Sequence, residues 1–441
     1  MSEKMSRRAV LHGGGVLALS AFTTSVFASC SAPNTGTSGA GPSKDFSFYS
    51  WDTTPDTPLA KVANSWAKSK NVNLHLTTIP YANYDAKMLT VFSSGSEPDI
   101  MRINDDYVVG YHSRDQLLDL TPYMKKAGIK AEDYTPSTFN FPKQKDGTYP
   151  AWPIGSTPAI IYYNVDAFKA ANVPLPPKNW TSDGWTWDDF LKAAHALTDE
   201  AAHKWGVIAF PDTSNETIFP VSNGGPGIYS MDGQTFALAE PEGYEAMQWL
   251  ADLSLKEKVH PPFSEVLAGN TTPNWSLSQL ANGKAAMVTG TTGGIAYLRD
   301  NAKVNWDIAP TPAKVAQTTI STLMVLAIPK GSKNPDLAWD MINYATQDTG
   351  GKMIAETVGM LPVKKSVAAT IKMDSKGPAN FQLVQQALEH SVNENFSVNI
   401  SRARTIYRPV LDYVYSGQKT AKEALQGVQK QVNDVLQGKA S

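Results

Sequence analysis

The sequence predicts an α/β protein built around a mostly parallel sheet with helices on both faces, and three observations indicate this fold class. Strand-like and helix-like patterns alternate through residues 45–103 in the order strand, helix, strand, helix, strand. The same alternation starts again near residue 157. The chain has 441 residues, 42% hydrophobic and 18% charged, which is a globular composition and a length that allows two or three domains.

The first alternation places polar residues at the ends of its strands. Strands are predicted at 44–51 ("KDFSFYSW"), 72–79 ("VNLHLTTI") and 99–103 ("DIMRI"), with helices at 58–70 and 84–94 between them. Ligands of such sheets bind beyond the carboxyl ends of the strands. Those ends carry Trp51, Asp52 and the run from Asn104 to Tyr107.

The second alternation predicts further strands at 157–164, 204–210, 283–290 and 322–329. Helices are predicted at 165–172, 185–199, 241–258, 334–346 and 420–436. Three of these helices carry start signals: Thr186 as an N-cap, Asn334 as a cap followed by Pro335, and a capping box from Thr420 to Glu423.

Residues 1–29 are predicted to be a signal peptide. Lys4, Arg7 and Arg8 form a positive head, an apolar stretch follows, and small residues precede Cys30. Glycines in the apolar stretch argue against a lasting transmembrane helix. "SRRAVLH" resembles the twin-arginine export signal, and "FASC" resembles a lipobox, which implies that Cys30 is lipidated.

The lone cysteine and the segment after it predict a tethered protein. Cys30 is the only cysteine, so it forms no disulfide within the chain. Residues 30–43, rich in Ser, Gly, Pro and Thr, are predicted to be a flexible tether. The expected location is extracytoplasmic, lipid-anchored to the outer face of the cell membrane. Ordinary cleavage that leaves a free thiol stays open as an alternative.

The sequence contains no motif that indicates catalysis. It has no G-x-S-x-G, H-E-x-x-H, Walker A or C-x-x-C pattern, and its seven histidines are scattered. No metal or cofactor is therefore expected. The formal net charge of −2 and the absence of a basic run argue against a nucleic-acid partner. The adjacent carboxylates at 105–106 and 188–189 could serve as the acid and base of a glycosidase, so that function stays an alternative. Neighbouring residues, however, rarely face one cleft together.

Six stretches, in order, resemble the extracellular solute-binding proteins of ABC importers, the family that includes maltose-binding protein. They are "VFSSGSEPDIMRI" (91–103), the segment from "GTYPAWP" to "WTWDDF" (147–190), "GKAAMVTGTTGG" (283–294), "SKNPDLAWDMINY" (332–344), "GMLPVKKS" (359–366) and the final "SGQKTAKEALQGVQKQVNDVL" (416–436). Together they are distributed along residues 45–437.

The resemblance implies a two-lobed periplasmic-binding-protein-like fold with hinge crossovers and an interlobe cleft. Lobe 1 is expected to hold 44–156 and 320–361, and lobe 2 to hold 157–319 and 362–441. The crossings are then expected near Ser156, near 319–321 and near Pro362.

A sugar-binding cleft needs two kinds of side chain. Carboxylates, amides and arginine bind hydroxyls, and aromatic rings cover the C–H faces. The resemblance and the strand ends together make these residues ligand-binding candidates: Trp51, Asp52, Asn104, Asp105, Asp106, Tyr107, Trp152, Thr157, Phe219, Asn223, Gly224, Trp275, Thr291, Thr292, Gly293 and Arg404. Structural roles stay open for several of them, such as core packing for Trp51, hinge packing for Trp152, an N-cap for Asp105 or a surface ion pair for Arg404.

The implied function is that of a non-enzymatic, monomeric substrate-binding component of an ABC transporter. It captures a sugar or oligosaccharide and delivers it to permease subunits that are powered by a cytoplasmic ATPase. One alternative is a binding protein for a polyamine, glycerol phosphate or peptide, which Asp52, Asp105 and Asp106 keep open. The other alternative is a secreted glycoside-active enzyme.

Replacing the cysteine tests the lipid anchor. Cys30→Ala removes the only thiol, so we expect the variant to appear in the medium while the unchanged protein fractionates with membranes. Immunoblotting of both fractions measures this. A variant that stays with the membrane fraction contradicts the prediction.

Overall fold

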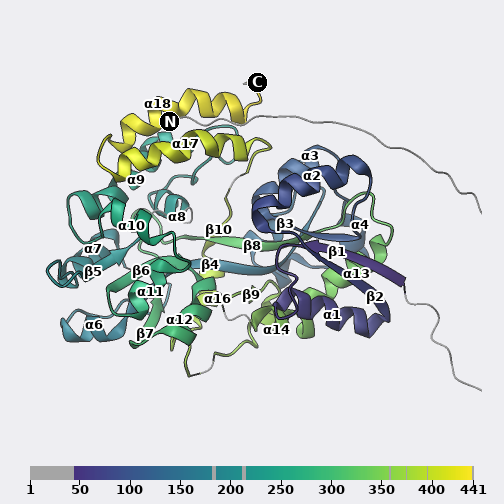
Figure 1. Ribbon diagram of the computed structural model, residues 1–441, viewed down its shortest axis with the longest axis horizontal. Helices are drawn as coiled ribbons and strands as arrows, with labels where there is room; N and C mark the ends of the chain where they lie inside the picture. Colours follow the sequence, from purple (N-terminus) through teal and green to yellow (C-terminus); the bar gives the residue numbers. More distant parts are fainter. Residues whose placement is uncertain are drawn as a thin grey trace, which may run out of the picture. The chain divides into compact units, whose positions relative to one another are not determined.

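Two long strands, β4 (Trp152–Asn164) and β8 (Thr319–Ala327), join the two halves of this protein. The computed structural model describes residues 44–180, 185–210, 215–356, 359–373, 375–394 and 396–439. Hydrogen-bonded strands follow the order β2–β1–β3–β8–β4–β6–β5, so β8 and β4 stand at the centre of one sheet. Figure 1 shows β1–β3 at one end of this arrangement and β5–β6 at the other.

The first half is built on three parallel strands. These are β1 (Lys44–Ser50), β2 (Val72–Thr78) and β3 (Ile100–Asn104), with β2 and β3 on either side of β1. Its helices are α1 (Pro58–Lys70), α2 (Tyr84–Ser94), α3 (Val108–Ser113), α4 (Thr121–Lys126), α5 (Pro136–Asn140), α13 (Pro335–Thr346) and α14 (Asp348–Ala355). Short β9 (Leu361–Pro362) and α15 (Lys365–Ala368) follow.

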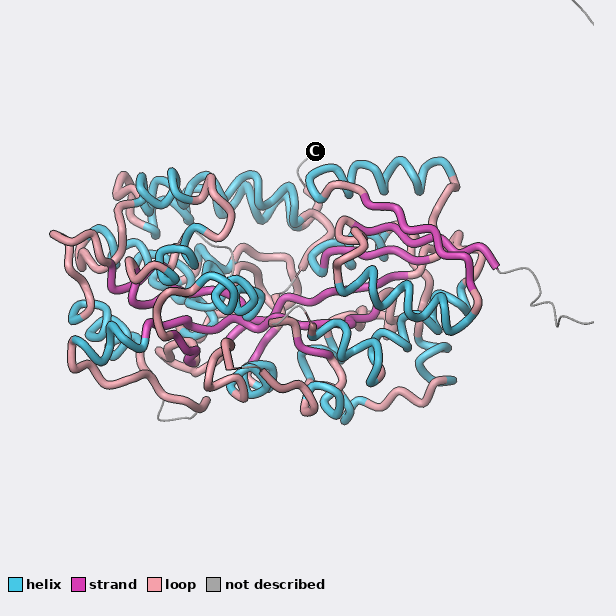
Figure 2. Tube along the Cα trace, turned by 60° about the horizontal axis from the view of Figure 1, so that its bottom comes forward, coloured by secondary structure: helices cyan, strands magenta, loops and turns pink. Residues whose placement is uncertain are grey.

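The second half contains the remaining strands and most of the helices. The strands are β5 (Trp205–Ile208), β6 (Ala285–Thr291), β7 (Trp306–Ala309) and β10 (Ser391–Val392). The helices are α6 (Val165–Ala170), α7 (Trp187–Ala196), α8 (Asn215–Ser222), α9 (Pro241–Leu255), α10 (Phe263–Gly269), α11 (Trp275–Ala281), α12 (Ile295–Asn301), α16 (Leu383–Glu389), α17 (Ile400–Tyr415) and α18 (Ala421–Leu436). Figure 2 shows strands running through the interior with helices on both sides.

Strand β4 changes its hydrophobic partners along its length. Trp152 and Ile154 pack with Trp66 in a core of the first half. From Ala159 onward, the side chains of β4 pack in two clusters of the second half. Strand β8 makes the same change, because Ile320 belongs to a second-half cluster while Leu323 to Leu326 belong to first-half clusters. The two halves therefore have separate cores and share these two strands.

The prediction of a mostly parallel sheet is correct for the outer strands and wrong for the centre. Strand β4 is antiparallel to β8, β6 and β7, and β3 is antiparallel to β8. A chain that crosses between two halves and then returns must run in opposite directions in its two crossings. Parallel pairing remains where helices connect neighbouring strands, as in β1–β3, and between β5 and β6.

Two of the three predicted helix starts are confirmed in full. Thr186 and Thr420 each accept a hydrogen bond from the third residue of the following helix and complete a capping box. Asn334 stands at the N-cap position of α13 but makes no capping bond. Its amide instead donates to the Asp45 carbonyl at 3.2 Å and to Asp99 Oδ1 at 3.0 Å, which fixes α13 to the sheet.

A glycine close to β9 meets the turn that follows β6. This turn is a 3₁₀ segment, η5 (Thr292–Gly294), and the Thr292 hydroxyl donates to the carbonyl of Gly359. Gly359 has φ of +116°, and a Cβ atom on it would lie 2.0 Å from the carbonyl oxygen of Thr292. Only glycine fits this contact, because both the backbone angle and the available space exclude a side chain.

Replacing this glycine tests the contact. We expect Gly359→Ala to lower the free energy of unfolding by at least about 2 kcal/mol, because the backbone must shift. The control is Gly427→Ala in the middle of α18, where an added Cβ meets nothing within 4 Å; this change should raise stability by about 1 kcal/mol. Urea denaturation measures both values, and equal effects of the two substitutions contradict the prediction.

Candidate functional site

A cavity of about 300 Å³ lies where side chains from the two halves meet. The first half contributes residues from the end of β3 and the segments beside it, and the second half contributes the loop after β10 and the helix α17. The floor is the stretch of β8 from Ile320 to Leu323. The lining residues are Tyr81, Arg102, Asn104, Asp105, Asp106, Phe141, Ile320, Ser321, Thr322, Leu323, Asn393, Glu394, Phe396 and Arg404.

Strand β3 delivers three predicted residues to this cavity. Asn104 is its last residue, and Asp105 and Asp106 follow in the 3₁₀ segment η2 (Asp105–Tyr107). The Asp105 carboxylate accepts hydrogen bonds from the backbone N–H of Leu323 at 3.0 Å and of Asp106 at 3.1 Å. These hydrogen bonds hold the Asp105 side chain against β8.

One ion pair spans the cavity. Arg404 Nη1 on α17 lies 3.2 Å from Asp106 Oδ2, and both side chains are largely shielded from solvent. A second interaction joins the same two elements, because the side chain of Ser401 on α17 acts on the Tyr107 hydroxyl and lowers its pKa against the larger effect of burial. Helix α17 of the second half is thus bound to η2 of the first half.

The acids of the cavity are held in a poorly solvated environment. The pKa of Asp105 is raised to about 7, mainly by burial and in smaller part by the negative charge of Asp106. Burial also raises the pKa of Asp106, against the opposing charge of Arg404. Burial raises the pKa of the Glu394 carboxyl as well, although it accepts a hydrogen bond from Thr217.

Two predicted residues lie behind the cavity wall and hold a third residue in place. Asp52 forms an ion pair with Arg102, and the Arg102 guanidinium lies 4.2 Å from the centre of the Trp51 ring. Trp51 in turn makes an edge contact with Tyr81 at 5.4 Å. Trp51 and Asp52 therefore orient lining residues and do not themselves line this cavity.

Three buried polar atoms of the lining side chains have no hydrogen-bond partner. They are Nε of Arg102, Nε of Arg404 and Oδ1 of Asn393. Unpaired buried polar atoms are costly, at about 1–3 kcal/mol each. These atoms are shielded from solvent but belong to side chains that line the cavity, so a bound solute that shifts these side chains can supply the missing partners.

Three other predicted residues line a different cavity, of about 470 Å³, within the second half. Trp275, Thr291 and Gly293 lie there between α11 and the end of β6. Thr292 is fully buried and bonded to Gly359, as described above. The predicted set is therefore divided between two places.

The remaining predicted residues lie in structural surroundings. Trp152 is in a core of the first half, where it makes edge contacts with Tyr134 and Phe139. Phe219 is fully buried in a core of the second half. Thr157, Asn223 and Gly224 do not line the interlobe cavity; Thr157 Oγ1 pairs with Thr322 Oγ1 at 2.5 Å, and Asn223 donates to the Glu242 carbonyl at 3.1 Å. Cys30 lies outside the described residues.

Sequence reasoning missed several lining residues. Arg102 had a detectable signal, since it is a charged residue between Met101 and Ile103 in an otherwise buried strand. Tyr81, Phe141, Asn393, Glu394 and Phe396 had none, because they lie in irregular segments whose position depends on the tertiary fold.

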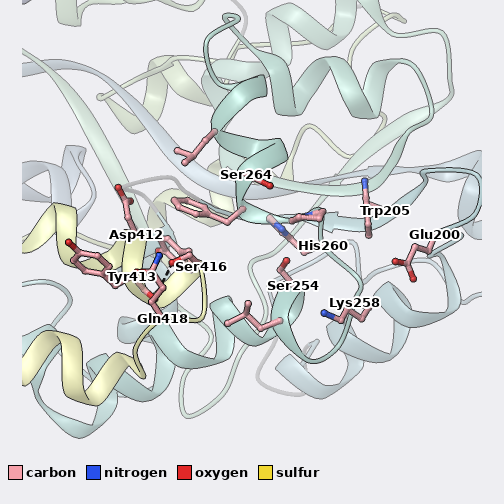
Figure 3. A pocket seen from close by; sticks show the side chains of 15 residues that line it. Glu200, Trp205, Ser254, Lys258, His260, Ser264, Asp412, Tyr413, Ser416 and Gln418 are labelled. Carbon is pink, nitrogen blue, oxygen red and sulfur yellow. Dashed lines mark hydrogen bonds between the residues drawn. The ribbon is translucent and has the colours of Figure 1, made fainter.

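Figure 3 shows a third cavity, of about 580 Å³, on the second half. Its floor includes His260, whose ring stacks on Phe210 at 3.8 Å, and Phe210 stacks on Tyr415. Burial lowers the pKa of His260 to about 3, so the ring stays neutral. No predicted residue lines this cavity.

The described residues contain neither a candidate metal site nor a membrane-spanning helix. No group of three or more His, Cys, Asp or Glu side chains in that part of the chain is arranged to hold a metal ion. No helix among the described residues is long and apolar enough to cross a membrane.

The raised pKa of Asp105 predicts a pH-dependent stability. Its pKa is about 7 in the folded protein, whereas an unperturbed Asp in the unfolded chain has a pKa of 3.8. Between these pH values the folded protein retains a proton that the unfolded chain has lost. Stability should therefore fall between about pH 4 and pH 7, by up to roughly 1.4 kcal/mol per unit. Asp105→Asn should flatten this slope, and exposed Asp56→Asn should not. Urea denaturation from pH 4.5 to 8 measures it, and parallel slopes for Asp105→Asn and the unchanged protein are the contrary result.

Comparisons with known proteins agree with this architecture. The sn-glycerol-3-phosphate-binding periplasmic protein UgpB of Shigella flexneri is 23% identical over 403 residues, 86% of this chain and 90% of that protein. The ABC substrate-binding protein Lmo0181 of Listeria monocytogenes, solved in complex with cycloalternan, matches with a TM-score of 0.74 at 20% identity, over 89% of this chain and 98% of that one. UgpB of Mycobacterium tuberculosis, in complex with glycerophosphocholine, matches with a TM-score of 0.73 at 18% identity, over 91% and 100%.

These likenesses show the two-lobed fold of periplasmic binding proteins. The family model of the bacterial extracellular solute-binding proteins matches residues 50–352. That match covers more than half of the chain. The protein therefore belongs to the bacterial extracellular solute-binding proteins, which are substrate-binding components of ABC transporters and not enzymes.

Proposed function

We propose that this protein captures a sugar or oligosaccharide in the cavity between its halves and delivers it to the permease of an ABC importer. The observation that carries the proposal is the set of unpaired buried atoms, two Nε–H donors and one amide oxygen, beside a cavity lined by acids, amides and hydroxyls. Sugar hydroxyls both donate and accept hydrogen bonds, so they match a lining of this kind.

Aromatic rings around the same cavity support a sugar ligand. Tyr81 and Phe141 come from the first half, and Phe396 comes from the loop after β10. Phe141 and Phe396 make an edge contact at 6.3 Å across the cavity. Aromatic faces cover the C–H surface of a sugar ring. The cycloalternan-bound relative from Listeria adds a likeness of fold.

The lobes of this proposal are 44–156 with 320–361, and 157–319 with 362–441. The exchange of hydrophobic cores along β4 and β8 supports crossings near Ser156 and 319–321. A solute that touches both lobes favours their closed arrangement, which then docks on the permease subunits. Within this proposal Cys30 carries a lipid, and a tether at 30–43 holds the monomeric protein at the outer face of the cell membrane.

A second candidate ligand class is a glycerol phosphate compound. The Shigella relative is named for sn-glycerol 3-phosphate, and the Mycobacterium structure contains glycerophosphocholine. Both proteins share less than a quarter of their residues with this chain.

Replacing Arg404 tests the function. A panel of mono- to tetrasaccharides should contain at least one that raises the melting temperature of the unchanged protein and reduces its radius of gyration in X-ray scattering. Arg404→Ala should weaken binding of that sugar at least tenfold, or about 1.4 kcal/mol, because it removes a donor and the ion pair across the cavity. Calorimetric titration measures the affinity.

The matched control lies on the same helix. Arg402 is exposed on α17 and does not line the cavity, so Arg402→Ala should bind as the unchanged protein does. If no sugar in the panel shifts the melting temperature while glycerol 3-phosphate does, the proposed sugar ligand is wrong.

A further inference from the structure

The charges of the cavity discriminate between classes of solute. Both guanidinium groups are already neutralised: Arg102 by Asp52 behind the wall, and Arg404 by Asp106 at 3.2 Å. Each nevertheless retains an Nε–H that lacks a partner. The two arginines therefore offer hydrogen-bond donors more than they offer uncompensated positive charge.

Two acids of the lining make no direct contact with a cation, although the charge of Arg404 acts on one of them, Glu394. Among the described residues, neither Asp105 nor Glu394 forms an ion pair. Asp105 accepts two backbone hydrogen bonds, and Glu394 accepts one from the Thr217 hydroxyl. No lysine or histidine lines the cavity in the part of the chain that the structure describes. The acids of the lining thus outnumber its cations.

An anionic solute fits this lining poorly. A phosphate monoester carries −1.5 to −2 charges near neutral pH, and its oxygens are acceptors only. It can pair with the two Nε–H groups, but at pH 7.5, above the pKa of about 7 that Asp105 has, it places a like charge beside the carboxylates of Asp105 and Glu394 in a poorly solvated space. Like-charge contacts of this kind are a general means of excluding a wrong ligand.

A cationic amine fits poorly for the opposite reason. An ammonium group has donors only. It can bind Asp105, Glu394 and Oδ1 of Asn393, but it leaves the Nε–H donors of Arg102 and Arg404 unpaired beside a positive charge. A hydroxyl is the group that donates to the acids and accepts from the arginines.

We infer that the cavity takes uncharged polyhydroxyl solutes and rejects their phosphorylated forms, with Asp105 and Glu394 as the residues that determine this specificity. The inference rests on the proposed function and narrows it. The ligand inferred for this chain therefore differs from the one for which its Shigella relative is named, since sn-glycerol 3-phosphate is a phosphate monoester.

The test compares matched solutes by calorimetric titration at constant ionic strength and pH 7.5. The panel contains mono- to tetrasaccharides, trehalose 6-phosphate, glucose 6-phosphate, glycerol 3-phosphate, glycerophosphocholine and spermidine. We expect the best uncharged sugar to bind at least tenfold more tightly than any phosphorylated compound and than spermidine. A phosphorylated compound or spermidine that binds within tenfold of the best sugar overturns the inference and leaves sugar binding intact.

Removing the acidic charges provides the second arm. In the Asp105→Asn, Glu394→Gln double variant, the ratio of the affinity for the best sugar to the affinity for the best phosphate compound should shrink at least fivefold. We call this affinity ratio the gap. Glu394→Gln alone should shrink it by a smaller factor, which keeps the test usable if the double variant folds poorly. Glu245→Gln, an exposed acid on α9, should leave the gap unchanged. An unchanged gap in a folded Glu394→Gln variant overturns the assignment of specificity. A protein that binds no uncharged sugar contradicts the proposed function itself, and the inference with it.

Discussion

The antiparallel pairing of β4 with β8 is the constraint on which the rest of this structure depends. Each strand leaves one hydrophobic core and enters another within a few residues, so two independently packed halves share a continuous set of backbone hydrogen bonds. Backbone pairing fixes which residues of the two halves can meet. It brings the end of β3 next to Met324 of β8, and β10 next to Thr319 and Ile320 of the same strand, so the residues that follow β3 and β10 approach the stretch between these positions.

Electrostatics then explains why polar residues can gather at this junction. The pair formed by Arg404 and Asp106 links α17 to η2, and the raised pKa values of Asp105 and Glu394 record how little water reaches these acids. Such an arrangement destabilises the empty protein and is retained at sites where a ligand supplies the missing partners. The cores of the two halves contain large buried rings, including Trp66, Trp152 and Phe219, and the site at their border combines polar groups with three aromatic rings.

Much of the fold could be predicted from local pattern. Helix α1 and strand β2 have their predicted positions because apolar spacing and turn residues are local properties of the chain. The direction of the central strands could not be predicted in this way, since it depends on how a chain crosses between halves. For the site, the strand-end rule led to Asn104, Asp105 and Asp106, and the family resemblance led to Arg404. Trp152 and Phe219 went into cores because an aromatic residue near a crossing satisfies either role, and sequence alone does not separate them.

The stretch of β8 from Ile320 to Leu323 has two positions at once, since it is the floor of the cavity and part of the connection between halves. A solute in the cavity therefore lies against the segment that connects the two halves. If the halves close around the solute as proposed, a solute that is too large holds them apart and one that is too small does not contact both, so size contributes to selection. Under that proposal, selection by size and selection by chemistry both involve this one stretch of β8.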